Sequence, residues 1–378
     1  MREPRIGLVI GLMRLSLPIV LTLAACSSSI VSTPAPAPDG GTDGSSLGDA
    51  GSHEELAYTN FVININDWVN PSQSADTLMR LIAIFEAHGV RGEFYFTAPV
   101  VDAYVATRPD LIARLRSSKM TISYHIRPPH PLYQGYQSGL SGKSGAELKA
   151  LLRDYETYKL SLTDQSLDKS QAGGFARVAD VFGKKPFTVS VSNTGPEKAL
   201  RSAAMDVYAE IGAKGAIVFH TGGTNPADPL ETQRGLLVRP SDLGVAEFAV
   251  GNETDYWWYR IIDPAVAPRW EPVLNMQTQL GAWTSKRKPF LVVLIHEHNF
   301  KRTGSEPFNS IYHVMNGQRP VSAKKAPWDL STPDVTEALT AEQSEAIFVA
   351  YDRMVAWASQ HTHVVTMEDI ATFDESKL

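Results

Sequence analysis

The sequence predicts an α/β fold in which parallel strands are covered by helices. From residue 56 to residue 125, strand-like and helix-like segments alternate in the order strand, helix, strand, helix, strand. Several of the strands alternate apolar and polar side chains, and three of them end in residues of the types that bind metals. This pattern is typical of a parallel sheet, or of a barrel, covered by helices.

The first strand lies within Phe61–Pro71, where the alternation of apolar and polar residues breaks at Asp67 and Trp68. Ser74–His88 has apolar residues at helical spacing and is followed by a glycine, which is typical of the end of a helix. The same reasoning predicts the next three elements in order: a strand at Arg91–Thr97, a helix at Pro109–Ser117 and a strand at Met120–His125.

The later elements are less regular but follow the same principle. We expect helices at Gly145–Leu160, Pro196–Ile211 and Thr340–Gln360, and strands at Phe187–Ser192, Gly215–His220, Phe290–His296 and His363–Thr366. Residues 221–288 are rich in Pro and Trp and lack a clear period, so we expect loops with a strand or two.

The alternation within the strands predicts an unusually polar inner face. If the face that bears Asn66 points into a barrel, the residues on that face are Asn64, Asn66, Glu93, Tyr95, Thr97, Thr121, Ser123, His125, Thr188, Ser190 and Ser192. Buried polar groups without partners are costly, so we expect hydrogen bonds or a metal to satisfy them.

The N-terminus predicts export and a lipid anchor. Three arginines within the first 14 residues precede an apolar run that is too short to span a membrane, as in a secretory signal. The run ends in Leu-Ala-Ala-Cys26, which resembles the lipobox of bacterial lipoproteins; a plain signal with an unrelated cysteine is the alternative. The resemblance implies a lipoprotein signal peptide at 1–25, lipidation of Cys26 and a cell-envelope location, at the outer membrane or cell surface.

The rest of the chain divides into a tether and one domain. Residues 26–55 are poor in large apolar residues and are expected to form a flexible tether, and residues 56–378 are expected to form one domain.

The charge and composition of the chain argue against a nucleic-acid partner. The chain has 378 residues, a formal net charge of -6 and no basic run, so no nucleic-acid partner is expected. No protein partner is inferred. Because Cys26 is the only cysteine, a disulfide framework and a cysteine-based zinc site are excluded.

Candidate metal ligands stand at the ends of three predicted strands. Asp67 follows the first strand, His125 and His130 flank the end of the third, and His296 and His298 follow the apolar late strand. Sites form at the carboxyl ends of parallel strands, and one carboxylate with two imidazoles leaves metal positions open for water and substrate.

These motifs resemble the polysaccharide deacetylase family, known as NodB homology or carbohydrate esterase family four. Asn64-Ile65-Asn66-Asp67-Trp68 lies over the family's first motif, the His-Pro loop over its second, and Leu294-Ile295-His296 over its late motif. The resemblance implies a distorted (β/α) barrel of about seven parallel strands, NodB-like. It also implies a divalent metal, taken to be zinc, held by Asp67, His125 and His130, with His296 as proton donor to the leaving group.

The general base remains open, because Asn66 stands where the family has an aspartate and an amide cannot take up a proton at useful pH. Metal-bound hydroxide, Glu93 and Glu297 are the candidates. Each residue also has a structural alternative: Asp67 could cap a turn, His296 could be a core histidine, and Glu93 could hydrogen-bond Asn64 or Asn66. Residues expected to contact substrate are Asn66, Trp68, Arg127, His220 and His298.

Two functions follow from the sequence. The first is a membrane-anchored, metal-dependent hydrolase that deacetylates cell-envelope or extracellular polysaccharide by cleaving an amide or an ester. The second is a non-catalytic surface lipoprotein that uses a degenerate deacetylase barrel to bind glycan. Whether the ligands and His296 converge at one barrel mouth separates the two.

Overall fold

The computed structural model describes residues 57–191, 198–218, 231–240, 272–281 and 290–372. All of them belong to one compact unit, residues 51–378. Cys26 and His220 lie outside the described residues. Within the described ranges, no helix is both long and apolar enough to span a bilayer.

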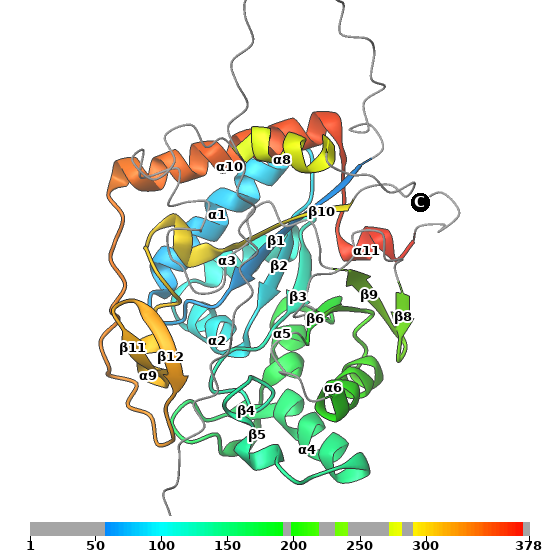
Figure 1. The fold of residues 1–378 in the computed structure, drawn as a ribbon, viewed down its shortest axis with the longest axis vertical. Helices are drawn as coiled ribbons and strands as arrows, with labels where there is room; N and C mark the ends of the chain where they lie inside the picture. The colour runs from blue at the N-terminus through cyan, green and yellow to red at the C-terminus, as the bar shows by residue number, and fades with distance from the viewer. Residues whose placement is uncertain (1–56, 192–197, 219–230, 241–271, 282–289, 373–378) are drawn as a thin grey trace, which may run out of the picture. The chain divides into compact units, whose positions relative to one another are not determined.

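The core of the fold is one curled sheet whose strands run mainly parallel (Figure 1). In the described part of the chain its seven parallel strands are, in spatial order, β10 (Phe290–His296), β1 (Tyr58–Ile65), β2 (Glu93–Phe96), β3 (Thr121–Tyr124), β6 (Thr188–Ser190), β7 (Gly215–Val218) and β9 (Leu236–Pro240). β8 (Glu231–Gln233) pairs antiparallel with β9, and β13 (His363–Val364) pairs with the start of β1. Among the described strands, no pairing joins β10 to the β8–β9 edge. The predicted fold class is therefore confirmed.

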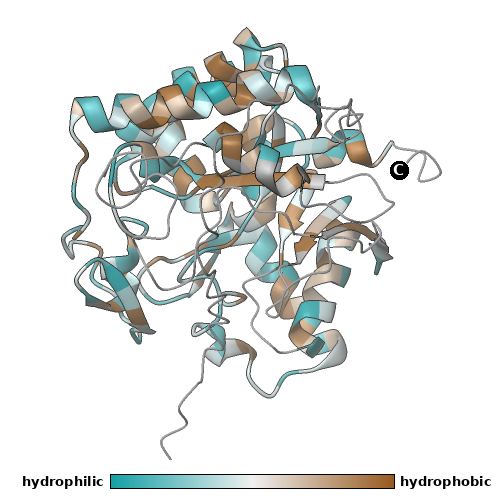
Figure 2. Ribbon diagram, turned by 45° about the horizontal axis from the view of Figure 1, so that its top comes forward, coloured by the Kyte–Doolittle hydropathy of each residue, from teal (hydrophilic) through white to brown (hydrophobic). Residues whose placement is uncertain are grey.

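Helices cover the outer surface of the sheet. The longer ones are α1 (Pro71–Ala87), α2 (Ala98–Thr107), α3 (Pro109–Ser117), α4 (Gly145–Thr157), α5 (Gly174–Phe182), α6 (Lys198–Ile211), α8 (Pro272–Gly281) and α10 (Ala341–His361). α10 packs against α1 and α8, as Figure 1 shows, and alternates hydrophobic and hydrophilic colours along its length (Figure 2). Its start is fixed by a capping box, in which the Thr340 hydroxyl accepts from the Gln343 backbone N–H.

Two hairpins and four short helical segments complete the described fold. The hairpins are β4 (Tyr158–Leu160) with β5 (Leu167–Ala172), and β11 (His313–Asn316) with β12 (Arg319–Ala323). The short helices are η5 (Glu297–Phe300), α9 (Asn309–Tyr312) and α11 (Met367–Ile370), and there is a further 3-10 turn, η2 (Gln137–Leu140).

The predicted elements match the structure closely where the sequence period is strong. The predicted strand Phe290–His296 and helix Pro109–Ser117 have these bounds in the structure. The prediction missed α2, α5 and both hairpins, and it extended α4 through three residues that form β4. Those segments are short, and tertiary contacts rather than local period decide their structure.

The predicted polar inner face is buried, and Glu93 shows how hydrogen bonds pair its polar groups. Glu93 accepts from Tyr95 Oη (2.6 Å), Ser123 Oγ (3.0 Å) and Asn60 Nδ2 (3.2 Å). The same face holds a small apolar cluster that includes Val62. Polar groups therefore share the inside of the sheet with ordinary core residues.

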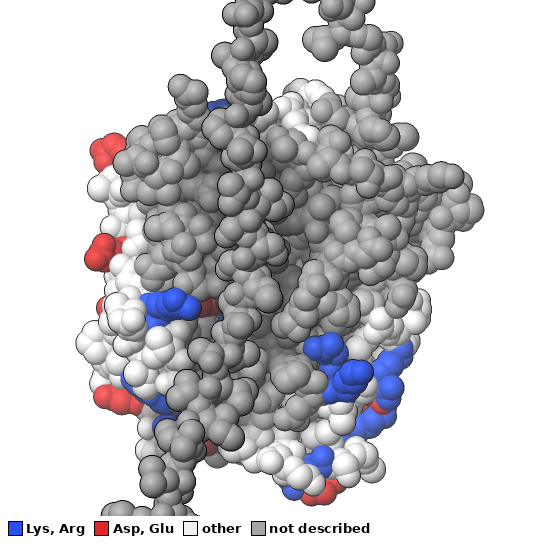
Figure 3. Space-filling model, viewed as in Figure 1, with Lys and Arg blue, Asp and Glu red and all other residues white. Residues whose placement is uncertain are grey.

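Charges on the described surface are mixed in sign. In Figure 3 a small group of Lys and Arg lies near the positions of α4 and α6 in Figure 1. Between α4 and α6, Lys149 pairs with Asp206 and Arg153 pairs with Glu210, and Arg234 also pairs with Asp206. These cations are therefore compensated locally.

Candidate functional site

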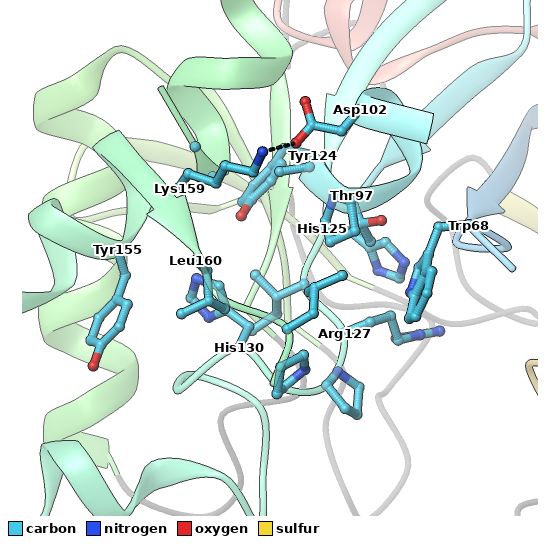
Figure 4. Close-up of a pocket in the computed structure, with 18 residues that line it drawn as sticks. Trp68, Thr97, Asp102, Tyr124, His125, Arg127, His130, Tyr155, Lys159 and Leu160 are labelled. Atoms are coloured by element: carbon cyan, nitrogen blue, oxygen red, sulfur yellow. Dashed lines mark ion pairs between the residues drawn. The ribbon is translucent and has the colours of Figure 1, made fainter. Parts of the chain in front are cut away.

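The predicted metal ligands are not brought together. No group of three His, Cys, Asp or Glu residues suited to a metal occurs among the described residues. In Figure 4, His125 and His130 lie apart from each other across a cavity. The partners of the three predicted ligands explain why the expected set does not assemble.

Asp67 is used to shape the turn between β1 and α1. Its Oδ1 accepts from the backbone N–H of Val69 (3.1 Å) and of Asn70 (2.9 Å), and Asn70 Nδ2 donates to its Oδ2 (3.2 Å). Burial raises the pKa of Asp67 to about 6, although the hydrogen bonds from Asn70 oppose this rise. The structural alternative, a turn-capping aspartate, is what the contacts describe.

His130 is directed toward a buried carboxylate on α4. Its Nε2 lies 3.3 Å from Glu156 Oε1, and its Nδ1 accepts from the Leu132 backbone N–H at 3.1 Å. Glu156 also accepts from Tyr208 Oη (2.5 Å) and from the Phe175 N–H (3.0 Å). Nδ1 of His130 is thus occupied by a backbone N–H, whereas Nε2 approaches Glu156 without a hydrogen bond of good geometry in the described structure.

His125 is joined to Asn66 across the strand ends. With the Asn66 amide oriented to suit its neighbours, its nitrogen donates to His125 Nε2 and to the Ile65 carbonyl (3.1 Å), and its oxygen accepts from Arg127 Nε (3.2 Å). Burial, together with Arg127, lowers the pKa of His125 well below its ordinary value. The Asn66 side chain therefore bridges β1 to the loop after β3.

His296 lies in a cluster with Arg127 and Glu306. Its Nε2 faces Arg127 Nη2 at 2.6 Å and Asn64 Nδ2 at 3.3 Å, and it lies 3.6 Å from Glu306 Oε1. Because Arg127 and Asn64 are donors, Nε2 is an acceptor, and burial lowers the pKa of His296 well below its ordinary value. In this structure the predicted proton donor is therefore an acceptor at Nε2.

The two glutamates considered as bases lie elsewhere. Glu93 begins β2, at the amino end of the sheet, and its Oε2 also accepts from the Met367 N–H (3.0 Å). Its partners are not the expected Asn64 or Asn66, because in the sheet register Glu93 is opposite Val62. Glu297 is fully buried beneath the strand ends and binds backbone rather than lining the cavity.

His298 also differs from its predicted role in substrate binding. It lies in η5, is 3% exposed, and makes no hydrogen bond of good geometry through either ring nitrogen within the described structure. Burial lowers its pKa to about 4. It does not line the cavity.

A cavity of about 230 Å³ lies beside the strand ends (Figure 4). Trp68, His125, Arg127 and His130 line it together with apolar residues of the loop after β3 and of β4, and with the start of α2. Trp68 is stacked on Phe308, with ring centroids 6.4 Å apart and planes 10° apart. Trp68 and Arg127 are thus the predicted substrate contacts that line an accessible space.

The wall opposite Trp68 depends on two glycines. A Cβ on Gly173 would lie 2.1 Å from the Tyr158 carbonyl oxygen, and Gly174 has a φ of +49°. Only glycine permits this close approach of the start of α5 to β4. The β4–β5 hairpin is therefore held against the cavity by backbone contact.

Sequence reasoning missed two site residues, Glu306 and Glu156. Glu306 lies in a loop without a period, and Glu156 occupies an ordinary position near the end of a helix. Nothing in the local sequence distinguishes them from exposed glutamates. Only their tertiary contacts with Arg127 and His130 do so.

Comparison with known proteins adds structural likenesses at low sequence identity. No family model matches the sequence, and no curated protein matches it significantly. Similar solved structures include a 4-alpha-glucanotransferase from Thermococcus litoralis (13% identity, TM-score 0.45), where the match covers 84% of this chain and 41% of that one. A CE4 family pseudoenzyme from Bacillus anthracis has 12% identity and a TM-score of 0.39, with 85% and 66% covered. The peptidoglycan deacetylase PdaC from Bacillus subtilis has 12% identity and a TM-score of 0.36, with 84% and 91% covered. The matches therefore span less than two thirds of the length of the glucanotransferase and of the pseudoenzyme. The likenesses are weak in sequence and in superposition, and we draw function only from the residues of this chain.

Proposed function

We propose that this protein binds carbohydrate in the cavity beside Trp68 and does not carry out metal-dependent deacetylation. The observation that carries the proposal is the use of each predicted metal ligand in another contact. Asp67 shapes a turn, His125 bonds Asn66 and His130 faces Glu156. The residue types suit a divalent metal, but their arrangement among the described residues does not, so no catalytic step is assigned to one.

The cavity supplies features that suit a sugar. Trp68 rests on Phe308 and also lines the cavity, so the indole can take the apolar face of a sugar ring. Thr97 and Arg127 line the same space and can bond hydroxyl groups. Ligand pockets usually measure roughly 300–1,000 Å³. A volume of about 230 Å³ therefore suits one sugar unit better than a long oligosaccharide.

The lipid anchor is part of the proposal and is supported by the first 26 residues alone. Anchoring through Cys26 would hold the cavity at the cell envelope, where glycans are abundant. Metabolic labelling with a clickable fatty acid tests this point. We expect incorporation in the wild type and none in Cys26→Ser, whereas equal labelling of both would disprove the anchor.

The proposed function is tested by measuring both binding and turnover. Calorimetry of the full chain against soluble oligosaccharides should detect binding that Trp68→Ala weakens and Trp68→Phe partly retains. Acetate release from chito-oligosaccharides, peptidoglycan and acetylated xylan should stay at background with zinc added. Zinc-dependent acetate release that disappears in Asp67→Ala would instead support the hydrolase.

A further inference from the structure

Every charged group that lines the cavity has a partner of opposite sign. Arg127 pairs with Glu306, with Nε and Oε1 2.9 Å apart. On the other side of the cavity Asp102 pairs with Arg177 at 2.7 Å and with Lys159 at 3.9 Å, the second pair being drawn in Figure 4. Arg177 also lies 3.2 Å from an exposed aspartate, Asp180. The described cations around the cavity are therefore compensated.

The Arg127–Glu306 pair is well shielded from solvent. The side chains are 12% and 16% exposed, and Asn309 Nδ2 donates to Glu306 Oε2 at 2.8 Å. Burial favours the protonated form, but the charged Arg127 guanidinium holds the pKa of Glu306 well below its ordinary value. Glu306 is therefore ionised near neutral pH.

His125 and His296, which lie beside Arg127, add no positive charge there. Burial lowers the pKa of both His125 and His296, so both rings are neutral near pH 7. Behind His130, Glu156 remains ionised: burial opposes this, but His130 and the hydrogen bonds from Tyr208 and the Phe175 N–H lower its pKa. No Arg or Lys among the described residues that line the cavity is therefore left without a carboxylate partner.

We propose that the cavity is selective for an uncharged sugar unit and that Glu306 sets this selectivity by neutralising Arg127. The inference rests on the carbohydrate-binding function proposed above. A hydroxyl can accept a hydrogen bond from Arg127 Nη1, which makes no hydrogen bond in the described part of the chain, and the ion pair stays intact. A carboxylate at the same place would lose its hydration, gain no net attraction and lie near the Glu306 carboxylate.

The test compares neutral and acidic ligands on the full chain. Dissociation constants are measured by calorimetry at one ionic strength for xylo-, cello- and chito-oligosaccharides and for oligogalacturonates of matched length. We expect the wild type to bind a neutral series at least tenfold more tightly than the acidic one. In Glu306→Gln, which leaves Arg127 uncompensated, the preference should move toward the acidic series by at least tenfold.

A matched variant controls for the loss of a shielded ion pair. Arg302 and Asp334 form a pair at 3.0 Å, with side chains 19% and 13% exposed, and neither lines the cavity. Asp334→Asn should therefore leave the ratio of neutral to acidic affinity unchanged. If thermal unfolding shows that Glu306→Gln does not fold, Asp102→Asn replaces it and should move the ratio in the same direction.

The outcomes separate this inference from the function on which it rests. Tighter binding of the acidic series by the wild type, or an unchanged ratio in a folded Glu306→Gln, overturns the selectivity and leaves carbohydrate binding in place. Absence of binding by any series removes both. A double variant, Arg127→Gln with Glu306→Gln, should return the ratio toward the wild-type value if the effect is one of charge.

Discussion

Glu297→Gln tests the electrostatics beneath the strand ends. Glu297 is fully buried, and its Oε1 accepts from the backbone N–H groups of Asn66 and Asp67, each at 2.6 Å, and from Ser74 Oγ at 3.2 Å. Its Oε2 has no hydrogen-bond partner in the described structure. A glutamine keeps the accepting oxygen and the shape of the side chain but cannot ionise, so it imitates the protonated acid.

The size of the expected difference in stability follows from the pKa of Glu297. Burial, together with the neighbouring Asp67 carboxylate, raises the pKa of Glu297 from 4.5 to about 8. Between these two pH values the folded state retains a proton that the unfolded chain releases, so stability falls as the pH rises through this window. At about 1.4 kcal/mol per pH unit, the full penalty above pH 8 has an upper limit of about 5 kcal/mol.

We therefore expect Glu297→Gln to match the wild type near pH 5 and to exceed its free energy of unfolding at pH 9 by about 2–4 kcal/mol. Urea unfolding followed by tryptophan fluorescence at pH 5, 7 and 9 measures this difference. Glu147→Gln serves as control, because the Glu147 side chain is 66% exposed. A variant less stable than wild type at pH 9 would refute the reasoning, since it would mean that the ionised carboxylate stabilises the fold.

Three further predictions follow from the site. Trp68→Ala should weaken sugar binding by about tenfold through lost stacking, whereas Phe308→Leu, which changes only the support of the indole, should weaken it less; calorimetry that ranks them in the opposite order would contradict the stacking role. His130→Ala should lower the free energy of unfolding by about 3 kcal/mol because Glu156 loses a buried partner, and a cost below about 1 kcal/mol in urea unfolding would rule out that pairing. Zinc should not raise the melting temperature of the wild type or of Asp67→Asn in scanning calorimetry; a zinc-dependent rise that Asp67→Asn abolishes would show that the ligands do assemble.

The fold could be predicted from sequence because its signals are local and periodic. The alternation in β1 and β10 and the helical spacing in α1 and α3 each arise from one buried face, which the pattern of apolar residues records directly. The short elements, such as the β4–β5 hairpin, have no such face. Their positions depend on contacts with distant residues, for example Gly173 against Tyr158.

For the site, the sequence determined which residues lie together but not what they do. The sequence by itself determined which strands end near one another and which side chains stand at those ends, because parallel strands share a carboxyl edge. It therefore identified Trp68, His125, Arg127 and His296 as neighbours of one site.

Only the tertiary structure decided what those residues do. The direction of a side chain and the charge of its ring depend on the partner that reaches it across the fold. His130 faces Glu156 of α4, and Arg127 pairs with Glu306. Glu306 lies in a loop whose sequence does not predict this contact. Burial, which no local pattern of polar residues records, then sets the ionisation of the histidines and of Glu297.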